Sequence, residues 1–248
     1  IFIVCIIKNF FSVLKKCIFV HYNIEYTDIN IIGAKSFKIV IMESFKSSIF
    51  KDKALKALSG KWKPSVIVSL VTMLIIGGSI AFQHVSVLLY YAVFWLFGSI
   101  VSIGCAYVFL DLYRDKKEPR VADLFTPFRQ YGRIVTCYIQ VLMFTILWSL
   151  LLFVPGIIKG LSYSMSYFIL KDRPELSPAE AIKESMRLMN GHKADLFILQ
   201  LSFIGWTILG LITVIGFIWV IPYINTSIAA FYEQLRNKDT GSLNTVTE

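Results

Sequence analysis

Charged residues are scarce in this sequence and unevenly distributed. Only 17% of the 248 residues are charged and 56% are hydrophobic, whereas an ordinary soluble domain has about 25% charged and about 45–50% apolar residues. Three runs contain no Asp, Glu, Lys or Arg, namely Pro64–Leu110, Gly160–Leu170 and Leu196–Tyr232. A water-soluble fold has too little polar surface to cover uninterrupted apolar sequence of this length. We therefore expect these runs to lie in a membrane.

Histidine and cysteine are also rare, and their positions argue against common kinds of reactive centre. His21, His84 and His192 lie in parts of the chain that cannot converge on one metal ion. The four cysteines form no CxxC motif, and we expect Cys105 and Cys137 to act as small apolar packing residues. Nucleotide-binding loops and GxSxG or HExxH motifs are absent as well. The sequence therefore predicts no metal, no cofactor and no catalytic residue.

Basic residues gather in the connections between the apolar runs. The net charge is +9, and the segments 42–64, 111–133 and 171–193 carry most of the Lys and Arg. The turns expected on the other side contain no Lys or Arg, and they lie at Gln83–Ser86, Val154–Gly156 and Ile215–Phe217. This alternation follows the positive-inside rule. It predicts a membrane protein with both termini in the cytoplasm, and it disfavours nucleic acid as a partner.

Three apolar blocks each have the length of a helical hairpin, since a bilayer core of about 30 Å needs roughly 20 helical residues, and they are Ser65–Leu110, Ile134–Leu170 and Leu196–Tyr232. The fold class predicted is an all-α polytopic membrane bundle of six transmembrane helices in three hairpins, with amphipathic cytoplasmic connector helices. The six segments are Ser65–Phe82, Val87–Leu110, Ile134–Phe153, Ile157–Leu170, Leu196–Val214 and Phe217–Tyr232. The fourth segment is short, and the alternative with five helices would place the C-terminus outside.

The rest of the chain divides around this domain. Residues 42–63 form a basic amphipathic segment typical of an interfacial helix, residues 64–235 are the membrane domain, and residues 236–248 are a polar cytoplasmic tail. Residues 1–41 begin with Ile and are rich in residues that AT-rich codons specify, which favours Met42 as the natural start and translated upstream sequence before it. An additional amphipathic anchor is the alternative.

One cytoplasmic connector has a clear helix-start signal. Ser177-Pro178-Ala179-Glu180 combines a capping serine, a first-position proline and a capping-box glutamate. Apolar residues from Ile182 to Met189 follow at helical spacing on one face, so we expect an amphipathic helix lying on the membrane surface.

The ends of the three runs resemble one another. Each has an aromatic residue, then aliphatic residues, then charge, at Tyr107–Arg114, Tyr167–Arg173 and Phe231–Arg236. A triplicated hairpin is one interpretation, and the ordinary aromatic belt of membrane proteins is the other. The acidic residues in the connections are interleaved with cations, which indicates a solvated, ion-paired surface, with a lipid-headgroup site as the alternative.

Small residues at helical spacing predict close helix packing. They form small-xxx-small ridges or lie opposite a polar side chain, and they are Gly98, Ser102, Ala106, Gly160, Ser164 and Gly205. A polar or lipid contact is expected at four further residues, which are Lys159, Gln200, Ser202 and Asn225. For Asn225 a buried structural amide is the competing interpretation. For Lys159 the competing interpretation is an ammonium group that reaches the outer face.

Five stretches taken in order resemble the bacterial membrane protein family called domain of unknown function 975. They are Ala54–Trp62, Pro155–Met165, Glu180–Lys193, Leu199–Trp206 and Val220–Glu233. The resemblance runs from about residue 44 to residue 236. It implies an integral membrane protein, typically of Gram-positive bacteria, whose biochemical role is not established, and it supplies no catalytic residues.

The sequence favours a non-enzymatic membrane component that binds a membrane lipid or a protein partner, because basic amphipathic segments and small-residue ridges occur without reactive groups. A carrier or export factor for an apolar or amphipathic solute or peptide is the alternative, and it requires a cavity lined by Asn225, Gln200 and Ser202. A lipid-modifying enzyme is a third hypothesis, and it requires carboxylates from separate connections to converge.

Overall fold

The regular structure is entirely helical in the part of the chain described by the computed structural model, which is residues 47–78, 97–115, 117–213 and 216–244. The expected all-α fold class is therefore confirmed. The predicted start at Met42 and the turn at Gln83–Ser86 lie outside the described residues. The described helices are Ser47–Leu58, α3 (Trp62–Gly78), α5 (Ser99–Tyr113), η3 (Val121–Gln130), α6 (Tyr131–Leu151), α7 (Phe153–Tyr163), α8 (Ser166–Asp172), α9 (Pro178–Leu188), α10 (Lys193–Leu201), α11 (Ile204–Thr213) and α12 (Gly216–Asn244).

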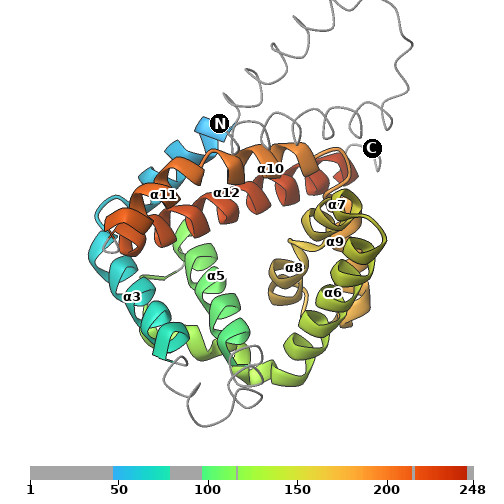
Figure 1. Cartoon of the computed structure of the whole chain (residues 1–248), viewed down its shortest axis with the longest axis horizontal. Helices are drawn as coiled ribbons and strands as arrows, with labels where there is room; N and C mark the ends of the chain where they lie inside the picture. The colour runs from blue at the N-terminus through green and yellow to red at the C-terminus, as the bar shows by residue number, and fades with distance from the viewer. Residues whose placement is uncertain (1–46, 79–96, 116, 214–215, 245–248) are drawn as a thin grey trace, which may run out of the picture.

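The long helix α12 organises the fold (Figure 1). It runs beside α10 and α11, and it also contacts α3, α5 and α9. Helices α3 and α5 lie toward one end of α12, and helices α6 to α9 lie toward the other end. The largest buried cluster joins α8, α9 and α12 through residues such as Met165, Met189 and Phe231. α12 is thus the element that both halves of the molecule share.

Two of the expected transmembrane helices are broken in the structure. The segment Ile157–Leu170 is divided between α7 and α8, and Leu196–Val214 is divided between α10 and α11. At each break a serine donates its hydroxyl hydrogen to the carbonyl oxygen three residues earlier, over 2.7 Å from Ser164 to Leu161 and 2.6 Å from Ser202 to Leu199. Such side-chain bonds compete with the regular helical pattern. The prediction of single continuous helices in these two segments was wrong.

Other boundaries also differ from expectation. α7 begins at Phe153, so the chain breaks at Leu152 and not within the predicted turn Val154–Gly156. α12 continues to Asn244, beyond the predicted end at Tyr232, and an ion pair of 2.6 Å between Arg187 and Asp239 links this extension to α9. Apolar content therefore located the helices but not their ends, which hydrogen bonds and packing determine.

Helix α9 begins with the capping box predicted from the sequence. Glu180 N–H donates to Ser177 Oγ, and the Glu180 carboxylate accepts from Ser177 N–H. The apolar face is buried against protein, however, because α9 packs on α6, α7 and α8 and fully buries Ser185 and Met189. The expectation that this face rests on the membrane surface was therefore wrong.

Ser185 bridges the break between α7 and α8. Its hydroxyl accepts a hydrogen bond from Met165 N–H and donates one to the Ser162 carbonyl oxygen, over 3.2 Å and 2.8 Å. The Ser185 residue is 0% exposed, so no water can replace these bonds. α9 thus supplies hydrogen bonds that the broken helix no longer makes for itself.

Replacing Ser185 with alanine is expected to destabilise the protein by about 1–3 kcal/mol, because a buried donor and acceptor lose their shared partner. Thermal unfolding in detergent would measure the loss. The matched control is Ser162→Ala, since Ser162 is equally buried but its hydroxyl bonds only to the Ile158 carbonyl of its own helix. We expect a smaller loss for the control, and equal losses would contradict the bridging role.

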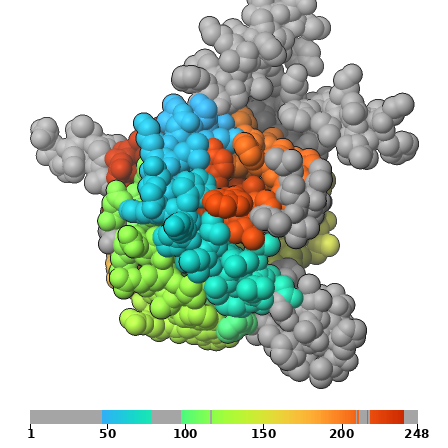
Figure 2. All heavy atoms as spheres, turned by 90° about the vertical axis from the view of Figure 1, so that its left-hand side faces the viewer, coloured from blue at the N-terminus to red at the C-terminus, as the bar shows by residue number. Residues whose placement is uncertain are grey.

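One described helix is long and apolar enough to cross a membrane. It comprises η3 and α6, over Val121–Leu151. Its most apolar stretch of 18 residues has a mean hydropathy of 2.0, and only 11% of that stretch is buried. A second segment meets the same requirement only if Ser47–Leu58 and Trp62–Gly77 are taken together, and these two helices meet at 104°. Exposed aliphatic side chains also occur on α3, whose outer face is shown in Figure 2, at Ile67, Leu70 and Leu74.

Candidate functional site

A cavity of about 430 Å³ lies among α3, α5, α6, α8, α10 and α12. Most of its lining is apolar, with Ile103, Phe168 and Leu196 among the contributors. Six of the ten residues singled out from the sequence line this cavity, and they are Gly98, Ser102, Ala106, Ser164, Gln200 and Asn225. Residues from three separate apolar runs therefore converge, as a ligand site requires.

The polar groups of the lining differ in their hydrogen bonding. Asn225 donates from Nδ2 to the Ile221 carbonyl over 2.9 Å, which leaves its Oδ1 and one N–H available. The side chains of Gln200 and Ser102 are exposed and form no hydrogen bond with the residues that the structure describes. In contrast, Ser164 and the pair Tyr138–Ser99 have protein partners. The cavity thus offers three incompletely satisfied polar groups within apolar walls.

The other four predicted residues lie elsewhere. Ser202 donates to the Leu199 carbonyl, and its own carbonyl oxygen accepts from Lys51 Nζ over 2.9 Å. A Cβ atom added at Gly205 would meet nothing within 4 Å among the described residues, and one added at Gly160 would make only an ordinary contact with Thr145 at 3.7 Å. The structure therefore places no close helix approach at either glycine. Close approaches occur at Gly104 and Gly156, which the sequence analysis missed.

Lys159 lies against α6 with its ammonium 4.8 Å from the centroid of the Trp148 ring. Burial lowers the pKa of Lys193, and the positive charge of Lys159 lowers it further. Lys159 lies in α7, which contacts α10, the helix that begins at Lys193, whereas the six-helix topology places these two lysines on opposite sides of the membrane. The position of Lys159 at the outer face stays a prediction.

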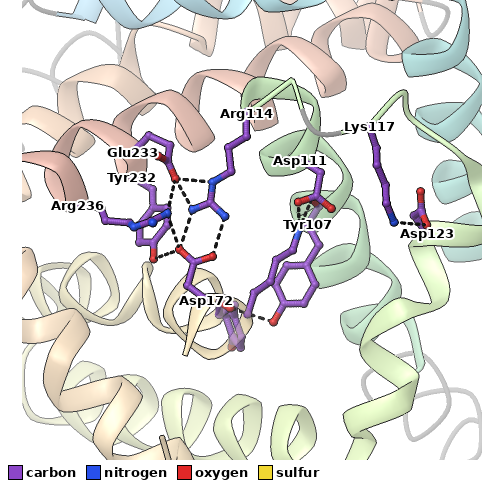
Figure 3. Close-up of polar contacts among 11 residues, drawn as sticks. Tyr107, Asp111, Arg114, Lys117, Asp123, Asp172, Tyr232, Glu233 and Arg236 are labelled. Atoms are coloured by element: carbon purple, nitrogen blue, oxygen red, sulfur yellow. Dashed lines mark hydrogen bonds and ion pairs between the residues drawn. The ribbon is translucent and has the colours of Figure 1, made fainter. Parts of the chain in front are cut away.

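An ion-pair cluster joins α8 and α12 through Arg114, which follows α5 (Figure 3). Arg114 donates to both carboxylate oxygens of Asp172 over 2.7 Å each, and its Nε donates to Glu233 over 2.6 Å. Tyr232 donates to Asp172 over 2.8 Å, and Arg236 lies 3.3 Å from both carboxylates. The side chains of Arg114, Asp172 and Glu233 are only 8%, 14% and 13% exposed. The prediction of a solvated ion-paired surface was wrong for this cluster, because the ends of α5 and α8 pack there against the middle of α12.

The hydrogen bonds alter the acidity of the cluster. Burial alone would raise the pKa of Asp172, but hydrogen bonds from Arg114 and Tyr232 lower it below its ordinary value. The two carboxylates in turn raise the pKa of Arg114 despite its burial. Arg114 and Asp172 are thus held in their charged forms at neutral pH.

The three charges come from the three similar run ends found in the sequence. Arg114 follows α5, Asp172 ends α8, and Glu233 lies in α12. A second contact joins equivalent aromatic positions, since Tyr107 donates to the Tyr167 carbonyl oxygen over 2.9 Å. The recurrence of aromatic, aliphatic and charged residues was the signal that these ends meet. The sequence alone did not show that they contact one another.

Helices α5, α8 and α12 each connect the cavity with the charged region. Ala106, Phe168 and Ile228 line the cavity, and charged residues follow on the same helices within eight residues. Lys171 contributes a further pair there, with Asp111 at 2.7 Å. The cavity and the ion-pair cluster therefore depend on the same three helices. In the part of the chain described, no group of three or more His, Cys, Asp or Glu is arranged to hold a metal ion.

Comparison with known protein families finds a match in the C-terminal part of the chain. The model of the family described as "Protein of unknown function (DUF975)" matches residues 149–239. This region contains Asp172, Gln200, Asn225 and Glu233, while α5 and Arg114 lie before it. No curated protein and no solved structure matches the chain. Residues 149–239 are therefore similar to this family of unknown function.

Proposed function

We propose that this chain is an integral membrane protein that binds a lipid or another amphipathic molecule in the cavity among α5, α8, α10 and α12. The observation that carries the proposal is the position of Gln200 and Asn225 in an otherwise mainly apolar cavity. Cavities of roughly 300–1,000 Å³ with a few polar groups are typical of small-molecule sites. The measured volume of about 430 Å³ falls in this range.

The surface of α6 supports a membrane location. Leu147, Leu150 and Leu151 are 63%, 80% and 69% exposed, and they follow one another along an uncharged stretch. A core helix of a soluble protein would bury such residues, since an exposed apolar patch this continuous is unfavourable in water. Lipid contact removes that cost.

For the topology we propose six membrane segments in a bacterial plasma membrane, with the N-terminus and C-terminus in the cytoplasm. The distribution of Lys and Arg supports this orientation. Helix α7 is the critical segment, because it carries Lys159 and contacts α10, which begins at Lys193. The topology can be tested by treating intact cells that carry Lys159→Cys or Lys193→Cys with a membrane-impermeant thiol reagent. Labelling of the cysteine at position 159 alone supports six segments. Labelling of both cysteines, or of neither, contradicts six segments.

Binding without catalysis is proposed because the cavity lining contains no carboxylate, imidazole, thiol or ammonium group among the described residues. Two connection carboxylates do converge, at Asp172 and Glu233, as a lipid-modifying enzyme would require. Both are hydrogen-bonded to Arg114, however, and the lowered pKa of Asp172 makes it a poor proton donor or acceptor near neutral pH.

Filling the cavity is the direct test. Ser102 is exposed on the cavity wall, so Ser102→Phe places a ring in open space without crowding the buried core. We expect the variant to fold and to retain several-fold less co-purified lipid than wild type, as measured by native mass spectrometry. Leu147→Phe on the outer face of α6 is the matched control and should retain the wild-type amount. A folded Ser102→Phe variant with unchanged lipid would refute binding in the cavity.

A carrier is the second candidate, favoured by the helix break next to the cavity. Ser164 and Met165 form the α7–α8 break, and both line the cavity. Broken helices at substrate sites are characteristic of membrane transporters. Transfer of a fluorescent amphipath between the leaflets of proteoliposomes would distinguish a carrier from a static binding protein.

A further inference from the structure

We propose that the molecule bound in the cavity is an uncharged amphipath whose hydroxyl, ester or amide group is hydrogen-bonded by Gln200 and Asn225. This inference rests on the proposed function and specifies the ligand class. A monoacylglycerol has this chemistry, whereas a lipid with a free phosphate or carboxylate does not.

The first argument is the lack of a counter-ion. The described lining contains no Lys, Arg, Asp or Glu. A charged group placed there would lose its hydration without gaining an opposite charge, and a phosphate ordinarily requires Arg or Lys donors. The walls of the cavity therefore select against both anionic and cationic groups.

The second argument is that the charges of the ion-pair cluster on the same helices are already paired. Arg114 is bound by Asp172 and Glu233, and Lys171 is bound by Asp111. Lys171 also donates to the Tyr107 carbonyl oxygen over 2.7 Å. A charged ligand would have to break one of these partly buried pairs to gain a partner. An uncharged ligand requires no such rearrangement.

The third argument is the unused hydrogen-bonding capacity of two primary amides. Asn225 bonds only through one N–H to the Ile221 carbonyl, and Gln200 forms no side-chain bond within the described chain. Each amide offers both a donor and an acceptor, as a neutral hydroxyl or ester group requires. In apolar surroundings such groups are unfavourable until they are paired. A neutral polar group between them satisfies both without introducing charge.

The test compares two ligands with the same glycerol and acyl chain. Monolauroylglycerol and lauroyl-lysophosphatidate differ only by the phosphate, and each is titrated into the full chain in nanodiscs at pH 7.5, with native mass spectrometry as the readout. We expect the monoacylglycerol to bind at least about tenfold more tightly. Gln200→Leu and Asn225→Leu should each weaken its binding by about five- to tenfold and change lysophosphatidate binding little. Ser202→Ala, outside the cavity, is the matched control and should behave as wild type.

A variant that is expected to gain binding excludes misfolding as the explanation, because a misfolded protein would lose binding. Asn225→Asp introduces one carboxylate into the cavity, so protonated dodecylamine should bind it about tenfold more tightly than it binds wild type. Equal or tighter binding of lysophosphatidate to wild type, or no gain for dodecylamine with a folded Asn225→Asp variant, would overturn the inference. In that case, if Ser102→Phe weakens the binding of either ligand, the ligand does bind in the cavity and only the proposed ligand class is wrong. If neither ligand binds and Ser102→Phe has no effect on native lipid, the proposed function fails as well.

Discussion

Replacing Arg114 with methionine is expected to destabilise the protein by about 3 kcal/mol or more, since removal of one partner leaves buried charges uncompensated. Arg114 is the shared partner of Asp172 and Glu233, whose side chains are 14% and 13% exposed. Arg236 lies 3.3 Å from both carboxylates and compensates for part of the loss. Thermal or denaturant unfolding in detergent would measure the effect.

The matched control is Arg187, which also bridges two carboxylates. Arg187 pairs with Glu184 at 2.8 Å and with Asp239 at 2.6 Å, but its side chain is 52% exposed. Exposed pairs contribute about 0–1 kcal/mol, so Arg187→Met should have a small effect. Adding Asp172→Asn and Glu233→Gln to Arg114→Met should restore most of the lost stability, because the unpaired charges are then removed. Equal losses for the two arginine variants would show that burial of the Arg114 cluster does not matter.

The substitution Gly104→Ala is expected to be almost as disruptive. A Cβ atom at Gly104 would lie 2.0 Å from the Leu124 carbonyl oxygen and 2.8 Å from its carbonyl carbon. Both atoms belong to the backbone of η3, and the Leu124 side chain is fully buried. No side-chain rotation can relieve this overlap, so α5 and η3 must move apart. Overpacking commonly costs about 1–3 kcal/mol, and we expect at least the upper end of that range.

Gly160→Ala provides the comparison for Gly104. Gly160 lies within α7, and a Cβ there would meet only Thr145 Cγ2 at 3.7 Å, an ordinary contact. Alanine favours a helix interior over glycine by roughly 1 kcal/mol, so this variant should be as stable as wild type or more stable. Circular dichroism during heating would rank the two variants. A stable Gly104→Ala together with an unstable Gly160→Ala would contradict the packing described for α5 and α7.

The sequence predicted which residue types would line a polar site, but it did not predict which of those residues would face the cavity. Gln200 and Asn225 stand out because they interrupt apolar sequence, and both line the cavity. Ser202 has the same signal and lies outside it, because the break between α10 and α11 directs its hydroxyl to the Leu199 carbonyl. Polar residues are visible in a sequence, whereas their direction depends on where each helix breaks.

The sequence by itself determined the helical fold class, the capping box at Ser177 and Glu180, and the similarity of residues 149–239 to a family of unknown function. These features depend on composition, spacing and local hydrogen bonds, which a few neighbouring residues specify. Only the tertiary structure showed that Arg114, Asp172 and Glu233 meet, and that Gly104 rather than Gly205 is a close approach. Arg114 is 58 residues from Asp172 and 119 from Glu233, so their contact depends on how α5, α8 and α12 pack together.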